Sequence, residues 1–312
     1  MLRAVHRLPL FALACALSLP ACGAELLPAQ ALLLPGVAGL LPKGTVAGLP
    51  EEHPDKPVLT RSVMLTSATT RPGPLRLALV VLEPAGGSRR ARLLAMRPRG
   101  SKMVSELDVT SEAPDFLDLR LGAFRPGGGA VLGVQWAGGP GPHEGLLQIW
   151  ALGDDGPIES FHSNAEGFYF EDVDGSGHAQ LVLYAPEADS LVFLPRVFDW
   201  QGNRLVESKG RHDRFDKRLL ADYDEVLDSW RAAAQPGDPP RMVMDVALQK
   251  GRLLERRSEK AAAFNAYEQA IDLVPDNLEL AEERQAYQRR EVLERVVEAR
   301  RRATVLYGFR PR

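Results

Sequence analysis

The stretch FYFEDVDGSGHAQLVLY, residues 168–184, decides the fold of this chain. It places two apolar, aromatic-rich runs on either side of a turn that is rich in Asp, Gly and Ser. Short apolar runs separated by residues of these types are typical of two strands joined by a tight turn. We therefore predict two strands here, and the two aspartates between them raise the question of a metal site.

The same alternation of apolar runs and turns extends over residues 58–210, which we predict to form a β domain. Two features recur about every 45–50 residues, a period that is typical of propeller blades. One is an aromatic residue before a glycine-bearing turn, and the other is a tryptophan, Trp150 and then Trp200. The expected strands are 75–83, 90–98, 116–124, 130–136, 145–152, 168–173, 179–185 and 191–200.

The 168–184 stretch resembles the FG-GAP/VCBS-type repeat, whose loop has the pattern D-x-[DN]-x-[DNS]-G between two strands. Asp172, Asp174, Ser176 and Gly177 fall on this pattern. The resemblance implies blade-like units, of which about three fit into the domain, fewer than the roughly four that a closed propeller needs. We therefore expect a mainly β N-terminal domain, either a partial propeller or a sandwich of blade-like units.

The loop of this repeat could hold calcium, which prefers six to eight oxygen ligands. The candidate ligands are Asp172, Asp174, Ser176, the backbone carbonyl of His178, and Gln180, where the family usually has a carboxylate. Only the two aspartates carry charge, so a site here would be weak, with a dissociation constant of roughly 10⁻⁴–10⁻³ M. The alternative is a metal-free turn in which the aspartates bond to their own backbone. Ca²⁺ is the only cofactor that the sequence suggests.

Residues 1–22 have the pattern of a secretory signal, with two arginines before an apolar core at 8–19 that is too short to span a bilayer. The sequence LPAC that ends it resembles the lipobox of bacterial lipoproteins, in which the cysteine receives lipid. This implies an exported protein anchored through Cys22 at the outer membrane or in the periplasm. Simple secretion after cleavage near Ala24 is the alternative. Residues 23–57, rich in Pro, Gly and Leu, are expected to be a tether.

The C-terminal part changes period. Apolar residues at three- and four-residue steps predict an amphipathic helix over 211–234, and QPGDPP at 235–240 predicts a linker. The remaining residues, 241–312, are predicted to form an α-helical module, which makes the chain a multi-domain protein of β and α parts.

This module resembles a single tetratricopeptide repeat, a pair of antiparallel helices. Five residues match its spacing: Gly251, Ala263, Tyr267, Ala270 and Pro275. The resemblance implies that small side chains at the first two positions let the helices approach, that the next two fill the contact, and that the proline ends the second helix. Because a single repeat buries little by itself, we expect the module to pack on another part of the chain or on a protein partner, with these five residues as candidates for the partner site.

The whole sequence contains no HExxH, GxSxG or P-loop motif, and a formal net charge of −3 gives no reason to expect nucleic acid. We interpret the chain as a non-enzymatic lipoprotein that serves as a protein-interaction or scaffold module at the cell envelope, with no small-molecule substrate identified. One alternative is a carbohydrate- or ligand-binding domain, which would need Trp136, Trp150 or Trp200 exposed in one groove. The other is an accessory subunit of an envelope enzyme or a hydrolase, which would need a buried base and nucleophile together.

Overall fold

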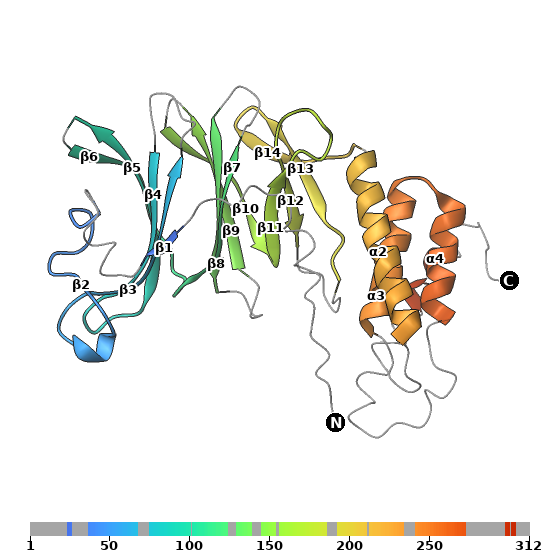
Figure 1. Cartoon of the computed structure of the whole chain (residues 1–312), viewed down its shortest axis with the longest axis horizontal. Coiled ribbons are helices and arrows are strands. Elements are labelled where there is room, and N and C mark those ends of the chain that lie inside the picture. Colours follow the sequence, from blue (N-terminus) through green and yellow to red (C-terminus); the bar gives the residue numbers. More distant parts are fainter. Residues whose placement is uncertain are drawn as a thin grey trace, which may run out of the picture. The chain divides into compact units, whose positions relative to one another are not determined.

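The chain folds into two compact units, one built from strands and one from helices (Figure 1). The first unit comprises Met1–Leu183 and Val197–Glu207, and the second comprises Tyr184–Arg196 and Ser208–Arg312. The expected mainly β part with helices at the C-terminal end is thereby confirmed. The computed structural model describes residues 24–26, 37–67, 75–100, 102–123, 129–138, 145–153, 156–185, 192–210, 212–233, 241–272, 297–299 and 301–303.

The strands form three sheets, and each sheet is built mainly from strands that follow one another in the sequence (Figure 1). The first sheet has the order β1-β3-β4-β5-β6 with β2 beside β3, the second β10-β9-β8-β7, and the third β11-β12-β13-β14. Described residues form no closed barrel or propeller. The strand bounds are β1 Ala24–Leu26, β2 Val46–Ala47, β3 Val58–Ser67, β4 Leu75–Glu83, β5 Arg90–Arg99, β6 Lys102–Thr110, β7 Phe116–Ala123, β8 Ala130–Ala137, β9 Gly145–Gly153, β10 Gly156–Ala165, β11 Gly167–Glu171, β12 Gln180–Tyr184, β13 Arg196–Gln201 and β14 Arg204–Glu207.

The first and second sheets share an apolar core. Leucines and alanines of β4 and β5 pack against β8 and β9, together with Trp136 and Trp150. Seven of the eight residues of β8 are buried, so both faces of this strand are covered. Such a strand reads as a continuous apolar run, which is why its position follows from the sequence.

The second sheet also packs closely on the third. Phe168 of β11 lies over Gly133 of β8, where an added Cβ would be 2.4 Å from the ring atom Cε2. Phe170 covers Gly122 of β7 in the same way, with its nearest ring atoms at 2.9 Å. The two glycines therefore form a recess for the aromatic side chains of β11, and a larger residue at either position would force the sheets apart.

Part of the segment expected to be a tether packs on the β unit. Val37 and Leu41 are buried against the outer face of the first sheet, in a cluster with residues of β4 and β5. Arg92 of β5 fixes this segment by donating from Nη1 to the backbone carbonyl of Leu40 at 2.8 Å. Beyond it lie β2 and a short 3₁₀ helix, η3 Pro50–Glu52. Residues 37–57 thus belong to the β unit, and burial explains Val37 and Leu41, whereas Leu49 is exposed.

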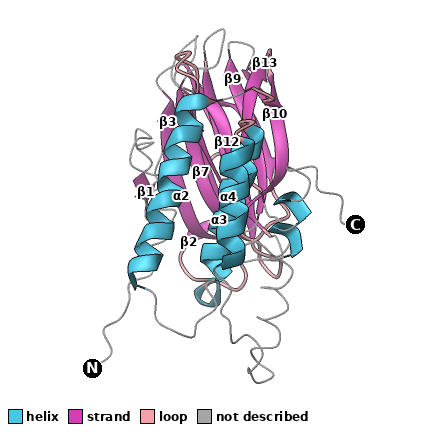
Figure 2. Cartoon of the chain, turned by 90° about the vertical axis from the view of Figure 1, so that its right-hand side faces the viewer, coloured by secondary structure: helices cyan, strands magenta, loops and turns pink. Residues whose placement is uncertain are grey.

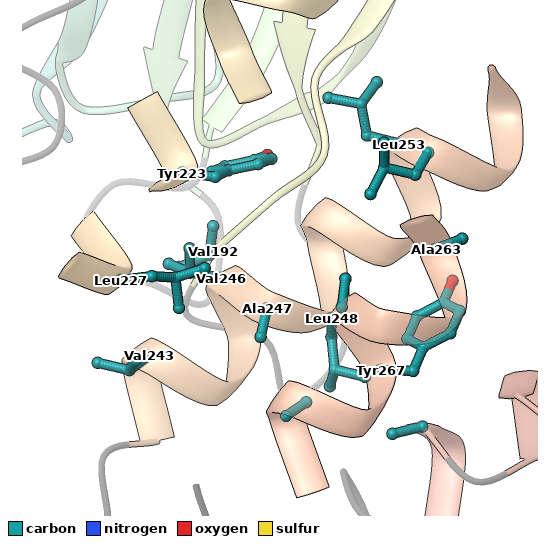
Figure 3. Packing of buried hydrophobic residues seen from close by; sticks show 14 of the residues in the cluster. Val192, Tyr223, Leu227, Val243, Val246, Ala247, Leu248, Leu253, Ala263 and Tyr267 are labelled. Atoms are coloured by element: carbon teal, nitrogen blue, oxygen red, sulfur yellow. The ribbon is translucent and has the colours of Figure 1, made fainter. Parts of the chain in front are cut away.

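Three helices of the second unit lie side by side: α2 Asp213–Ala233, α3 Arg241–Arg256 and α4 Lys260–Asp272 (Figure 2). The described residues 297–299 and 301–303 are helical as well. Their apolar side chains meet in one cluster, and Figure 3 shows Leu227 of α2 and Val246 of α3 beside Val192. Val192 comes from the segment between β12 and β13, and its carbonyl accepts a hydrogen bond from Nε2 of Gln249 at 2.9 Å. No helix among the described residues is long and apolar enough to cross a membrane.

The turn between α3 and α4 ends the first of these helices in a specific way. Ser258 has φ 64°, in the left-handed region. The backbone N–H of Glu259 donates to Leu254 O at 2.9 Å, and that of Ser258 donates to Glu255 O at 2.8 Å. This pair of bonds is the Schellman motif, which satisfies carbonyls at a helix end. It reverses the chain within three residues and sets α4 antiparallel to α3.

Candidate functional site

The predicted metal loop connects β11 to β12. Gly175 and Gly177 have φ of 78° and 80°, values that favour glycine because other residues meet steric strain there. Asp172, Asp174 and Ser176 are exposed on the turn between β11 and β12. The structure therefore brings the predicted ligands into one short loop, which has left-handed positions on either side of Ser176.

The side-chain oxygens of this loop accept hydrogen bonds from its own backbone. The N–H of Ser176 donates to Oδ1 of Asp174 at 3.0 Å, and the N–H of Gly177 donates to Oδ2 of Asp172 at 2.9 Å. The N–H of Val173 donates to Oε1 of buried Gln180 at 2.9 Å. The bond to Asp174 is the Asx turn of the metal-free alternative, the bond to Asp172 spans the loop, and Gln180 closes the loop from inside.

Asp174 has a pKa lowered from the ordinary 3.8 to about 2. Partial burial by itself raises this pKa, but hydrogen bonds from the side chain and backbone of Ser176, and bonds with Gln180 and Asp172, lower it by more. The carboxylate is therefore stabilised in its charged form by the turn. This is the state that both a metal ligand and an Asx turn require.

A cation would find two carboxylates in this loop. The ring Nδ1 of His178 is buried without a hydrogen-bond partner, while the predicted ligand is its backbone carbonyl. Among the described residues, no three or more His, Cys, Asp or Glu side chains gather as a metal centre would need. The hydrogen-bonded turn accounts for every predicted ligand side chain, and calcium binding stays a prediction of the sequence.

The residues predicted to bind a partner lie inside the helical hairpin. Gly251 of α3 faces Tyr267 of α4, and an added Cβ at Gly251 would be 2.2 Å from Cε1 of the ring. Ala263, Tyr267 and Ala270 are fully buried in the same cluster, as Figure 3 illustrates for Ala263 and Tyr267. These four residues hold the two helices together, so a partner must contact other residues. Pro275 lies outside the described residues.

The Tyr267 hydroxyl belongs to a charged network in the same unit. It donates to Oε2 of Glu255 at 2.8 Å, and Nη1 of Arg302 donates to the same oxygen at 2.7 Å. Burial and then the hydrogen bond to Glu255 raise the pKa of Tyr267 above its ordinary range. Arg302 also bonds to Glu298, so this network ties residues near the C-terminus to the hairpin. Its role is structural, because every charge in it is paired.

A groove of about 280 Å³ lies between α2, α3 and α4. Its apolar surface comes from the leucines and alanines at 220, 254, 262 and 266, and its charged pair is Lys250 with Asp224, which form an ion pair. Asn265 and Gln269 of α4 complete the lining. Neither amide has a side-chain partner among the described residues. Sequence reasoning missed this groove, and the only signal for it is the one-turn spacing of these two amides.

Two of the three tryptophans proposed for a carbohydrate surface are buried. Trp136 is 1% exposed and donates from Nε1 to Gln148 Oε1 at 2.6 Å. Trp150 is 2% exposed within the core of the β unit. Trp200 is half-buried and its Nε1 donates to Ala179 O at 3.0 Å. These side chains form no shared exposed groove, so the prediction that depended on one loses its basis.

One serine and histidine pair comes close to a catalytic arrangement. Nε2 of His212 lies 3.1 Å from the hydroxyl of Ser208, just before α2. A serine nucleophile needs a third group to orient the histidine through its other nitrogen. Nδ1 of His212 is buried without such a partner, and the nearby carboxylate of Asp216 is paired with Arg256 and Arg257. The pair therefore lacks the orienting group of a hydrolase site.

The chain was compared with family models, with curated proteins and with solved structures, and none of them matches it.

Proposed function

We propose that this chain is a non-enzymatic protein-interaction or scaffold module of the bacterial cell envelope, and that the groove of its helical unit is the partner site. The observation that supports this proposal most directly is the composition of the groove. It combines an apolar floor with two carboxamides, exposed Asn265 and half-buried Gln269, that have no partner among the described residues. Exposed apolar surface beside unsatisfied polar groups is typical of a contact surface.

The tetratricopeptide-like arrangement supplies the support for this surface. Tyr267 packs on Gly251, and the Schellman turn fixes the direction of α4, so the groove lies on rigid elements. A rigid surface loses little conformational entropy on binding. The hairpin residues that match the repeat thus position the partner site, and the groove residues form it.

Site-specific photocrosslinking in the native host tests the proposal. Asn265 is replaced by p-benzoyl-phenylalanine, and the matched control carries the same residue at Ala261, which is exposed on α4 but does not line the groove. We expect a discrete adduct with another protein from position 265 only, identified by mass spectrometry. Equal adducts at both positions, or none at 265, would reject the groove as the partner site.

The envelope location rests on Cys22, which lies outside the described residues. We propose that it carries lipid and that the chain is anchored at the membrane by it. Mass spectrometry of the mature protein from membrane fractions should show a diacylglycerol-modified N-terminal Cys22, and Cys22→Ser should release the protein. A soluble chain that begins near Glu25 in the wild type would support simple secretion instead.

For the β unit we propose a partial propeller of three FG-GAP-like blades, in preference to a sandwich. The second and third sheets are each one meander, and β3 to β6 form another in the first sheet, whereas sandwich domains pass the chain between sheets in Greek keys. Trp150 and Trp200 both lie on the third strand of their sheets, and β7 contacts β11. An experimental structure should relate successive sheets by one repeated rotation. Two sheets aligned at about −30° would indicate a sandwich.

A further inference from the structure

The register of β1 fixes the end of the first sheet at which the chain enters the β unit. β1 is antiparallel to β3, with Ala24 opposite Met64. The start of β1 therefore points toward Ser67, where β3 ends. Cys22 lies outside the described residues, but it is two residues before Ala24, a span of at most about 7 Å. A lipid anchor at Cys22 would hold this end of the sheet at the membrane surface.

Three exposed cations lie at the same end of the first sheet. Arg76 of β4 is opposite Thr66 of β3, two residues closer to the end than Met64. Arg99 and Lys102 are opposite one another in the hairpin that joins β5 to β6. All three side chains are exposed, and they form no hydrogen bond or ion pair with any described residue. Their charges are therefore available to a ligand.

The acidic side chains of the sheet do not cancel these charges. Glu106 of β6 is neutralised by Arg97, whose Nε and Nη2 donate to its two carboxylate oxygens at 2.6 and 3.0 Å. At the opposite end of the sheet, where β5 begins with Arg90, the carboxylates of Glu83 and Glu112 are present as well. Among the described residues, the excess positive charge of the sheet is thus concentrated at the end near the proposed anchor.

Apolar side chains accompany the cations of the hairpin. Pro98 of β5 is exposed, and Val104 of β6 is 38% exposed. The hairpin also extends past Arg76, because Arg99 lies three residues, or about 10 Å, beyond the residue opposite Arg76, which is Met96. Basic and apolar side chains together suit the boundary between lipid headgroups and acyl chains. The hairpin has this composition and extends in the direction of the proposed anchor.

Resting on the lipid anchor proposed above, we infer that this end of the first sheet lies on an anionic phospholipid bilayer. Arg76, Arg99 and Lys102 contact lipid phosphates, and the hairpin enters the headgroup layer. An anchor within about 7 Å of Ala24 holds the sheet end inside the roughly 8 Å over which surface charge acts at physiological salt. The strands of the first sheet thus extend away from the membrane, and the end at Arg90 faces the solvent.

Vesicle flotation of the purified Cys22→Ser protein tests the role of charge without a lipid anchor. The probes are vesicles of phosphatidylcholine alone and of phosphatidylcholine with phosphatidylglycerol in equal parts, at low salt. We expect binding to the anionic vesicles only. Arg99→Gln and Lys102→Gln should each weaken it about fivefold, the effect of one basic residue at an anionic surface. Arg90→Gln, the same charge change at the opposite end, should change binding by less than about twofold.

Energy transfer in the anchored protein tests the orientation. A donor dye is attached to Val104→Cys at the hairpin or to Ser88→Cys at the opposite end, and the lipid headgroups carry the acceptor. The sequence has cysteines only at 15 and 22, so the introduced thiol is the one free to react once the signal is removed and Cys22 carries lipid. The two labels are separated by about 30 Å along the strands. We expect strong transfer from position 104 and weak transfer from position 88.

Equal transfer from the two labels overturns the inference, and so do equal effects of Arg99→Gln and Arg90→Gln on flotation. Circular dichroism checks that every variant is folded. The mass of Cys22 separates this failure from failure of the anchor. If Cys22 carries lipid and either of these results is obtained, the anchor stands and the sheet end does not face the bilayer. An unmodified Cys22 in the membrane fraction rejects the anchor and the inference that rests on it.

Discussion

Asp174 shows how one side chain can set the shape of a connection. Its Oδ1 accepts the backbone N–H of Ser176, and left-handed glycines follow each of these two residues. The carboxylate is exposed, yet its pKa is about 2 because the hydrogen bonds outweigh the effect of partial burial. The residue types in this loop could be predicted to form a turn. Which oxygen accepts which N–H could not, because Asx turns and metal loops use the same residues.

The depressed pKa of Asp174 predicts a specific dependence of stability on pH. A group whose pKa is lower in the folded state stabilises the fold above its ordinary pKa and loses this contribution as the pH falls. The stabilisation by Asp174 should therefore be complete above pH 3.8 and decline toward about pH 2. Asparagine does not titrate. The difference in unfolding free energy between wild type and Asp174→Asn should be constant above about pH 4 and shrink below it.

Urea unfolding between pH 2 and 6 measures this difference. Asp55→Asn is the control, because it removes one carboxylate from an exposed turn outside the loop. If the unfolding free energies of wild type and Asp174→Asn differ by the same amount at every pH, the carboxylate of Asp174 is not stabilised by the turn.

Among the elements, strands with continuous apolar runs could be predicted well from the sequence. The expected range 75–83 coincides with β4, and 130–136 differs from β8 by one residue. Within residues 58–210, four strands were missed, and three of them close their sheets at an edge: β6, β10 and β14. Their burial patterns alternate or are mostly exposed, because an edge strand needs less apolar sequence. Once these strands are included, the period of about 45–50 residues corresponds to one four-stranded meander.

In the helical unit too, some residues could be predicted from the sequence and others could not. Gly251 and Tyr267 could be predicted to touch because a motif with fixed spacing encodes their packing. Asn265 and Gln269 could not be identified, since exposed amides are common on helices and only the fold reveals the groove beside them. The two pairs of residues differ in burial. Residues that the repeat pattern singles out are buried and stabilise the hairpin, whereas Asn265 and Gln269 are not buried.

The packing of β11 on β8 predicts a large effect from one methyl group. Gly133→Ala would place Cβ 2.4 Å from Cε2 of Phe168, well inside contact distance. Overpacking of this kind costs about 1–3 kcal/mol. We expect Gly133→Ala to lower the free energy of unfolding by that amount, measured by urea denaturation. The double variant Gly133→Ala with Phe168→Leu should recover part of the loss. A double variant less stable than the sum of the single losses would contradict the contact.

At the scale of the whole molecule, the chain passes between the two units more than once. Residues 184–196 leave the β unit between β12 and β13 and belong to the helical unit, to which Ser208–Arg312 then contributes the helices. This excursion is held by Val192, which is buried in the helical cluster and bonded to Gln249. Nε2 of Gln249 is itself buried, so the bond has no competition from water. No local sequence pattern predicts this hydrogen bond, because its partners are 57 residues apart.

Loss of this bond predicts unequal effects on the two units. Gln249→Ala leaves the carbonyl of Val192 without that donor, at a cost of about 1–3 kcal/mol. Circular dichroism at 222 nm follows α2, α3 and α4, while three of the four tryptophans, Trp136, Trp150 and Trp200, report on the β unit. We expect the 222 nm transition to shift to lower urea and the fluorescence transition to shift less. Gln269→Ala removes an amide without a partner among the described residues. It should change the unfolding free energy obtained from either transition by less than about 0.5 kcal/mol. Equal shifts in both signals for Gln249→Ala would instead mean that the two units unfold as one cooperative body.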